Sequence, residues 1–467
     1  MLNAGDTAWV LASAALVMLM TPGLAFFYGG MVRAKSVLNM LMMNFICLAI
    51  VAVLWVLYGF GESFSNDAFS GLIGNFDHAG FANTWGQLAG FATAATDTAP
   101  EVAWPGADAI PVLAFAMFQL MFAIITPALI SGAIADRAKF WGWALFVVLW
   151  VTIVYFPVAH WVFSFDGFIG PDAAGGWIAN KLKALDFAGG TAVHINAGAA
   201  GLALAIVLGK RKGWPKDVGR PHNVPFVLLG AALLWFGWYG FNAGSALSAG
   251  DLAGVAFTNT TVATAAAVLG WLLVEQLKFG KPTTLGAASG AIAGLVAITP
   301  ACGFVTPLGS IAIGVIAGVL CALAVSLKYK LGFDDSLDVV GVHLVGGLIG
   351  TLLVGFLAVD GVSGPAQFGK QALGAFSVLA FSFTVSWLLA KLVQVTVGFR
   401  ADADDETAGV DQVFHAETAY DFGAVGGSAA RRRGAPVAPS GGPASATGAA
   451  GTARDDKPGS LDHKVDA

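Results

Sequence analysis

The sequence predicts an all-α polytopic membrane protein with eleven transmembrane helices. Hydrophobic residues make up 57% of the 467 residues, charged residues only 11%, and the mean hydropathy is +0.75. Soluble domains carry about 25% charged residues. Eleven runs approach the roughly 20 apolar residues that a helix needs to cross the hydrocarbon core. The short alternating segments of a transmembrane β-barrel are absent from the sequence.

The predicted spans follow one another within residues 1–400, the expected transmembrane domain. They cover 8–31, 37–60, 111–134, 140–158, 190–209, 224–245, 257–277, 284–302, 308–327, 336–358 and 373–396. Glycine accounts for 61 residues, close to double its usual share of about 7%. In membrane helices such an excess indicates close packing through small side chains.

Basic residues orient these spans with the N-terminus outside and the C-terminus in the cytoplasm. In this orientation the cytoplasmic loops and helix ends hold most basic residues of the domain, among them Arg33, Arg137 and Arg211. The outside keeps only Lys181, Lys183 and Lys370. This positive-inside bias predicts an inner or plasma membrane protein. Because no basic segment precedes the first span, we expect a helix there and not a cleaved signal peptide.

The external segment 61–110 is acidic and has no Lys or Arg. Its acidic residues are Glu62, Asp67, Asp77, Asp97, Glu101 and Asp108. A surface of one sign can concentrate cations near an entrance. The alternative is that external loops are simply poor in basic residues, and both interpretations stay open.

The composition changes after residue 400. Residues 401–422 are polar and acidic, which predicts an ordered cytoplasmic tail. Residues 423–467 are rich in Gly, Ala, Pro and Ser around Arg431–Arg433, and they lack the apolar content of a core. This extension is expected to be disordered, and its arginines either touch anionic lipid or remain solvated.

His194 and His343 are the titratable residues in the middle of the fifth and tenth spans. Intramembrane ionisable residues usually mark a functional path. Each histidine follows an aspartate, Asp186 or Asp335, by eight residues, or roughly 12 Å of helix. The two spans enter from opposite faces, so both histidines approach the midplane. Spans 1–5 and 6–10 then form inverted repeats with a site at their interface, and an eleventh helix follows.

Each histidine also has a purely structural interpretation, as a core residue bonded to a backbone carbonyl. For a single histidine we would favour that interpretation. For a matched pair we favour function.

Several long motifs resemble those of the ammonium transporter family (the Amt/Mep/Rh superfamily), in its bacterial Amt type. They are Asp186–Gly190 with Val193–Asn196, Gly237–Ser245, Gly290–Val296 with Thr299–Gly303, and Asp338–His343. The resemblance covers nearly all of residues 5–422. It implies a homotrimer with one narrow pore per subunit, and ammonium, ammonia and methylammonium as substrates.

The resemblance also assigns an outer site and a gate. The recruitment site matches Ser245 and Phe122, and Phe163 stands where the family has tryptophan. Phenylalanine is the weaker cation–π partner, so external affinity is expected to be weakened unless Trp161 substitutes. Close packing in a Gly/Ala-rich run is the alternative for Ser245. The gate of two stacked rings matches Phe122 and Phe241.

The remaining matches surround the pore. Asp186 either stabilises the incoming cation or caps its helix, and capping with some electrostatic contribution is the favoured role. Trp238 and Gln119 are supporting candidates. His194 and His343 are expected to line the path as neutral rings and to relay the proton left when ammonium becomes ammonia.

The tail around Asp411, His415, Glu417 and Tyr420 resembles the family's regulatory tail, which implies a PII-type signal protein as a partner. Ala416 stands where the family usually has glycine. A tail with only a stabilising role is the alternative.

Two other functions are alternatives to transport. One is an ammonium sensor that signals through the tail with little flux. The other is an intramembrane enzyme with the histidines as metal ligands, which lacks carboxylate or cysteine partners. Cys47, Cys302 and Cys321 show no metal-ligand spacing either. We therefore expect no enzyme activity, cofactor, metal or nucleic-acid partner.

Overall fold

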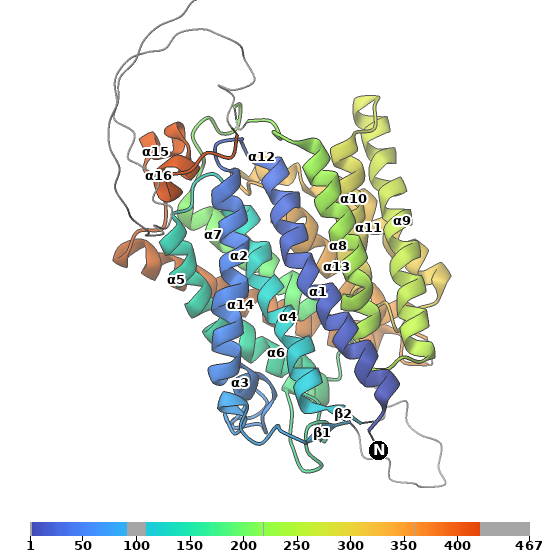
Figure 1. Cartoon of the computed structure of the whole chain (residues 1–467). Coiled ribbons are helices and arrows are strands. Elements are labelled where there is room, and N and C mark those ends of the chain that lie inside the picture. The colour runs from blue at the N-terminus through green and yellow to red at the C-terminus, as the bar shows by residue number, and fades with distance from the viewer. Residues whose placement is uncertain (1, 91–108, 218, 360, 421–467) are drawn as a thin grey trace, which may run out of the picture. The chain divides into compact units, whose positions relative to one another are not determined.

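The computed structural model describes residues 2–90, 109–217, 219–359 and 361–420. The expected extension 423–467 lies outside these residues. The described chain is a bundle of long helices (Figure 1). Ten helical stretches in it are long and apolar enough to cross a membrane. This is the helical polytopic fold that the composition predicts.

The ten stretches include several that join consecutive helices. In chain order they are α1 (Ala4–Met31); α2 (Val37–Leu54), η1 (Trp55–Gly59) and α3 (Phe60–Phe64); α4 (Val112–Ile130) and η3 (Ser131–Ile134); α5 (Phe140–Trp150), η4 (Val151–Tyr155) and α6 (Phe156–Phe163); η6 (Gly190–Ile195) and α7 (Asn196–Leu208); α8 (Val224–Gly244); α9 (Asp251–Phe279); α11 (Pro307–Ala324) and α12 (Leu327–Leu331); η7 (Val340–Leu344) and α13 (Val345–Leu357); and α14 (Pro365–Thr396).

The predicted span 284–302 corresponds to a shorter helix, α10 (Thr284–Ile298), of 15 residues. Its length of roughly 22 Å is less than the hydrocarbon core of about 30 Å. The chain leaves the helix at Thr299 and Pro300, since proline cannot continue the hydrogen-bond ladder. Eleven crossings are consistent with the bundle if α10 and the turn that follows it count as one.

Six other stretches run past their predicted ends, among them α1, which begins at Ala4 and not at 8, and the stretch of α11 and α12, which ends at Leu331 and not at 327. Polar residues continue the helices beyond the apolar runs in α9 and α14, which begin at Asp251 and Pro365 and not at 257 and 373. The second and fourth stretches extend to Phe64 and Phe163, beyond the predicted ends at 60 and 158. A hydropathy pattern marks the apolar part of a helix and does not mark its caps.

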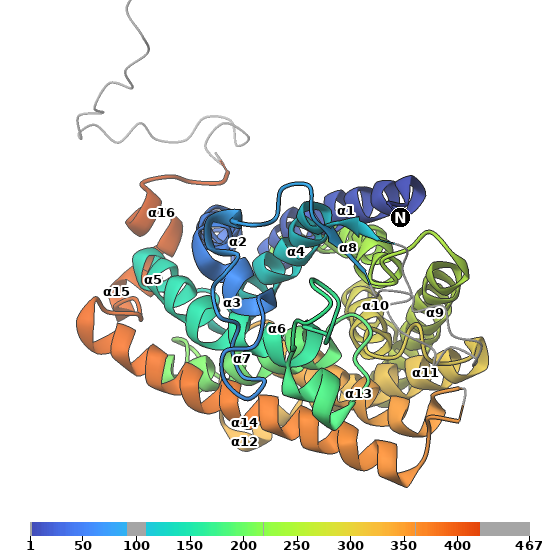
Figure 2. The same ribbon diagram turned by 90° about the horizontal axis from the view of Figure 1, so that it is seen from below.

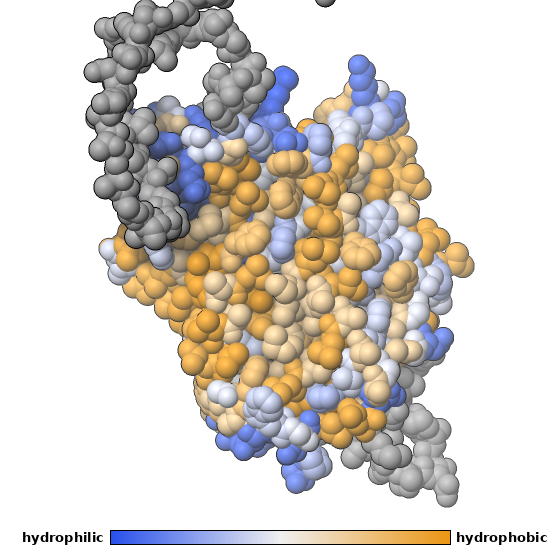
Figure 3. Space-filling view, in the orientation of Figure 1, coloured by the Kyte–Doolittle hydropathy of each residue, from blue (hydrophilic) through white to orange (hydrophobic). Residues whose placement is uncertain are grey.

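The surface is apolar around the middle of the bundle and hydrophilic at its two ends (Figure 3). Large side chains such as Leu269 and Leu308 are 70% and 78% exposed. A soluble protein would bury such residues, whereas lipid tails accept them. The exposed apolar band therefore fits the hydrocarbon core.

Glycine permits the closest helix approach beside the two histidines. A Cβ atom on Gly198 of α7 would lie 2.5 Å from the backbone nitrogen of Leu344. One on Gly347 of α13 would lie 3.2 Å from Cβ of His194. Any larger residue at Gly198 would push the two histidine-bearing stretches apart.

The start of the first helix and the tail helices lie at opposite ends of the bundle (Figure 1). The N-terminal end carries η2 (Ala79–Phe81), η5 (Ile178–Leu182), and the antiparallel strands β1 (Leu88–Ala89) and β2 (Ile110–Pro111), with Leu88 opposite Pro111. The other end carries the tail helices α15 (Ala403–Ala408) and α16 (Val410–His415). Seen along the bundle, α14 follows one flank beside α7 and α13 (Figure 2).

The acidic segment 61–110 is only partly on the surface. Glu62 is buried, and Asp67 lies 3.4 Å from Nε2 of the buried His160. Asp77 accepts a hydrogen bond from Asn75. Asp97, Glu101 and Asp108 lie outside the described residues. Glu62 is therefore not part of an exposed acidic surface.

Arg211 is the centre of a buried charge cluster at the tail end of the bundle. Its guanidinium donates to both carboxylate oxygens of Asp334 at 2.9 Å and to Asp136 at 3.2 Å. Glu406 of α15 joins the same end through Arg400. Burial alone would raise the pKa of Asp334, but Arg211 and Arg137 lower it below its usual value. The stabilisation is therefore present at neutral pH and is lost as the pH falls through that lowered pKa.

Replacing Arg211 by methionine is expected to destabilise the protein by about 3 kcal/mol, because Asp334 stays buried without the guanidinium bonded to both of its oxygens. Among the described residues, Asp136 then keeps only the ion pair with Arg33, at 3.7 Å. Thermal unfolding in detergent measures the loss. Lys212→Met is the matched control, since the side chain of Lys212 is exposed and its backbone N–H makes the contact with Glu406. Equal melting temperatures for the two variants would contradict the role of the cluster.

Candidate functional site

Asp186 caps the helical stretch that carries His194. One carboxylate oxygen accepts the backbone N–H groups of Gly189 and Gly190, both at 2.7 Å. The other accepts those of Thr191 at 2.7 Å and Ala192 at 3.3 Å. The first turn of a helix leaves such N–H groups without intrahelical partners. A single buried carboxylate thus accepts four backbone hydrogen bonds at the start of η6.

Asp335 takes the same position in the stretch that carries His343. Its carboxylate accepts the backbone N–H groups of Val339 at 3.1 Å and Val340 at 2.7 Å. Burial raises the pKa of Asp335, against the opposing charge of Lys328. Both stretches then begin with a π-helical turn, η6 and η7, and each turn contains the histidine. Such turns are frequent at functional sites.

His194 and His343 meet in the interior. Their Nδ1 atoms are 3.4 Å apart, and the ring centroids are 5.5 Å apart with planes at 21°. Their exposed fractions are 1% and 3%. The structural interpretation expects a backbone carbonyl on each ring. Here each ring's Nδ1 faces the other histidine, and Nε2 of His194 has no hydrogen-bond partner among the described residues.

Trp238 and Phe241 of α8 cover the other side of the pair. The indole of Trp238 stacks on His194 at 5.4 Å with planes at 17°, and Phe241 lies 6.0 Å from the same ring. The indole N–H donates to Thr299 Oγ1 at 2.9 Å. His194 is therefore held between His343 and two aromatic rings.

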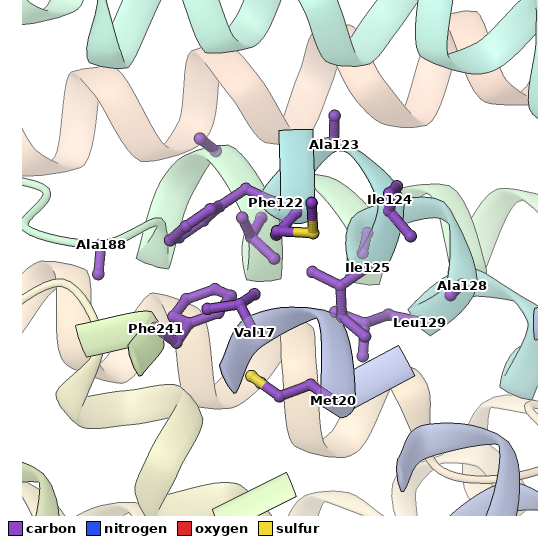
Figure 4. Close-up of a cluster of buried hydrophobic side chains, with 14 of the residues drawn as sticks. Val17, Met20, Phe122, Ala123, Ile124, Ile125, Ala128, Leu129, Ala188 and Phe241 are labelled. Carbon is purple, nitrogen blue, oxygen red and sulfur yellow. The ribbon is translucent and has the colours of Figure 1, made fainter. Parts of the chain in front are cut away.

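Phe122 and Phe241 pack against each other (Figure 4), with ring centroids 4.3 Å apart and planes tilted by 34°. Both rings are 1% exposed. Val17 and Met20 of α1 lie in the same apolar cluster. The two buried rings lie next to His194, which is 6.0 Å from Phe241.

Phe122 also lines a small cavity, whose described wall does not include Phe241 or the two histidines. Its volume is about 20 Å³, enough for one water-sized species. The lining residues are Phe115, Phe118, Gln119, Phe122, Phe163, Phe165, Phe168, Phe187, Ser245 and Leu247. The Ser245 hydroxyl donates to the Phe241 carbonyl at 2.7 Å, so its lone pairs can accept a further donor.

The structure brings Ser245, Gln119, Phe122 and Phe163 to one cavity, but it places Trp161 elsewhere. The indole of Trp161 donates to the Leu72 carbonyl and packs on Trp177 and Phe381. Sequence reasoning missed most of the remaining wall. The spacing of Phe115, Phe118 and Phe122 along one helical face was the available signal.

The tail residues contact the bundle at separate places. The Asp411 carboxylate accepts the N–H groups of Leu38 and Asn39, so it caps α2 from another part of the chain. His415 lies 3.0 Å from Asn39 Oδ1 and packs on Phe140. Tyr420 shares a hydrogen bond with His222 at 2.8 Å.

Ala416 and Glu417 directly follow α16. Glu417 is exposed. Ala416 adopts a φ of 55°, a left-handed conformation that glycine takes without strain.

Comparisons with known proteins match this chain to ammonium transporters over most of its length. Residues 8–420 match the Ammonium Transporter Family. The chain is 60% identical to an ammonium transporter of Mycobacterium tuberculosis over 443 residues, which are 91% of this chain and 92% of that protein. It is 45% identical to ammonium transporter Amt1 of Archaeoglobus fulgidus over 426 residues, 89% and 99% of the two chains.

Solved structures give the same result. Mep2 of Saccharomyces cerevisiae aligns with a TM-score of 0.73 and 35% identity, covering 86% of this chain and 88% of that one. A protein titled Sensor Amt Protein aligns with a TM-score of 0.78 and 29% identity, covering 88% and 98%.

Replacing Asp186 by alanine is expected to lower stability by about 2–3 kcal/mol, because four buried N–H groups lose their acceptor. Asp251→Ala is the matched control, an exposed acid in the first turn of α9, and should cost less than about 1 kcal/mol. Thermal unfolding in detergent compares the two. A small loss in both variants would show that Asp186 is not a structural cap.

Proposed function

The chain belongs to the ammonium transporter family, and we propose that it binds ammonium at the outer cavity, removes its proton and conducts ammonia past the histidine pair. The observation that carries the proposal is the buried contact of His194 with His343, 3.4 Å between Nδ1 atoms. Two neutral polar rings in an apolar bundle suit a neutral polar solute.

The outer cavity has the chemistry to receive ammonium. The faces of Phe122 and Phe163 are negative and attract a cation. Ser245 supplies an oxygen that accepts an N–H donor. The described residues that line the cavity include no carboxylate, so binding stays weak enough for the ion to move on.

The barrier of Phe122 and Phe241 favours ammonia over ammonium. An unpaired charge at the bilayer centre costs from a few to more than ten kcal/mol. Ammonia avoids most of this cost after it leaves its proton behind. Potassium has no proton to lose, so the same barrier excludes it.

The histidine pair can then guide the neutral base. The contact between the Nδ1 atoms uses one donor and one acceptor. One ring therefore presents a bare Nε2 and the other an Nε2–H, which gives the path an acceptor and a donor. The acceptor is also the place for a proton that crosses by relay, which would make transport electrogenic.

The setting of this transport follows the orientation of the basic loops. We place the N-terminus and the outer cavity outside an inner or plasma membrane, and α15 and α16 in the cytoplasm. The protein works as a homotrimer with one pore in each subunit. Its tail, bonded to α2 through Asp411, is the contact for a PII-type signal protein.

A second candidate is an ammonium sensor that signals through this tail with little flux. The similarity to the Sensor Amt Protein favours it. Ammonium uptake by liposomes that contain the purified protein separates the two functions, because a sensor binds ammonium without comparable flux.

The double variant His194→Ala/His343→Ala is expected to lose the ammonium-evoked current in liposomes by about a hundredfold, because acid–base groups contribute at least that factor. His78→Ala, a histidine of an external loop, is the control and should keep the current. Potassium is measured in parallel and should not pass through the wild-type protein. A double variant with wild-type current and selectivity would refute the mechanism.

Phe163→Trp is expected to lower the ammonium concentration for half-maximal transport about two- to fivefold, because indole is the stronger cation–π partner. Trp161→Phe should leave this concentration unchanged, since Trp161 lies outside the cavity lining. The opposite pattern would assign the recruitment role to Trp161.

A further inference from the structure

A buried hydrogen-bond network connects the histidine stack to the end of α10. Thr299 Oγ1 accepts the indole N–H of Trp238 at 2.9 Å. Its own proton faces the Leu295 carbonyl at 2.7 Å and Asn242 Oδ1 at 3.3 Å. Asn242 in turn donates to Thr260 of α9 at 2.9 Å. The exposed fractions of Thr299, Asn242 and Thr260 are 0%.

The network restrains the orientation of the Trp238 ring plane. The planes of the Trp238 indole and the His194 ring are 17° apart, and a hydrogen bond at the edge of the indole adds to packing in fixing this orientation. The indole has a single N–H group, and Thr299 Oγ1 accepts its hydrogen bond. Turning the indole would leave a buried donor without a partner, which is costly in an apolar interior.

The same hydroxyl lies next to the gate. Asn242 directly follows Phe241 in α8, so its contacts with Thr299 and Thr260 restrain the backbone that carries the gate ring. Pro300, the next residue after Thr299, accepts the N–H of Phe187 through its carbonyl. The end of α10 therefore contacts the histidine stack, the gate and the loop that contains Asp186.

We propose that Thr299 is a positioning residue that fixes Trp238 against His194 and thereby sets the orientation of the histidine pair. This rests on the proposed function of that pair. Thr299 itself does not contact either histidine ring through any hydrogen bond in the described structure; it acts through the indole.

A bond between a threonine hydroxyl and the carbonyl four residues earlier is common inside helices. Thr264 of α9 makes such a bond to Thr260 at 2.6 Å and is equally buried. What distinguishes Thr299 is the indole N–H that it accepts. Thr264 is therefore the matched control for the loss of a buried threonine hydroxyl.

The test compares Thr299→Val, Thr299→Ser and Thr264→Val in liposomes. Valine keeps the shape and removes the acceptor, whereas serine keeps the acceptor. We expect Thr299→Val to lower the maximal ammonium current by about tenfold, the factor for one lost buried hydrogen bond. The half-saturating concentration should stay unchanged because the outer cavity is intact. Thr299→Ser and Thr264→Val should keep the wild-type current.

A wild-type current in Thr299→Val overturns the proposal, as does an equal loss in Thr264→Val or a failure of serine to restore transport. The His194→Ala/His343→Ala variant separates this outcome from failure of the proposed function. If that variant loses the current and Thr299→Val does not, only the role of Thr299 is wrong.

Trp238→Phe provides a second measurement if Thr299→Val does not fold. It removes the indole N–H and keeps an aromatic ring on His194. We expect a loss similar to that of Thr299→Val, and no further loss when Thr299→Ser is added. A wild-type current in Trp238→Phe overturns the proposal.

Discussion

The contact between His194 and His343 is the constraint on which the surrounding structure depends. Two polar rings in the middle of an apolar bundle need partners there, since lipid and apolar side chains supply none. To meet, they require two helical stretches that begin at opposite ends and approach within contact distance. Asp186 and Asp335 stabilise the starts of these stretches, because their carboxylates accept the first backbone N–H groups. Gly198 and Gly347 allow the approach.

Much of this arrangement could be predicted because it repeats along the chain. The spacing of eight residues between aspartate and histidine occurs twice, and topology alone brings the two copies to one depth. The cavity wall could not be predicted in the same way. Phe165, Phe168 and Phe187 reach it from loops whose course depends on tertiary contacts. Thr299 lies within one of the matching motifs, but nothing in a sequence shows which indole a hydroxyl will meet.

The tail illustrates a different limit of sequence reasoning. Its acidic composition predicts an ordered segment but not the partner of each carboxylate. In the structure Asp411 bonds the first N–H groups of α2, whose own N-cap residue Ser36 makes no side-chain cap bond. Glu406 bonds Arg400 and the backbone of Lys212. A change in the tail therefore alters the start of a membrane helix directly, which gives a physical route from a contact on the tail to the bundle.

In the proposed mechanism the outer cavity receives a charged ion and the histidine pair a neutral base, and the rings of Phe122 and Phe241 lie between the two. Aromatic faces and one hydroxyl attract a cation only modestly, whereas a carboxylate in the same place would hold it. Asp186, which caps the stretch that carries His194, has both oxygens occupied by backbone N–H groups. Its charge is thus directed to the helix start and away from a bound ion. In the proposed mechanism, an ion held weakly beside a barrier that a charge cannot cross cheaply gives up its proton and continues as ammonia.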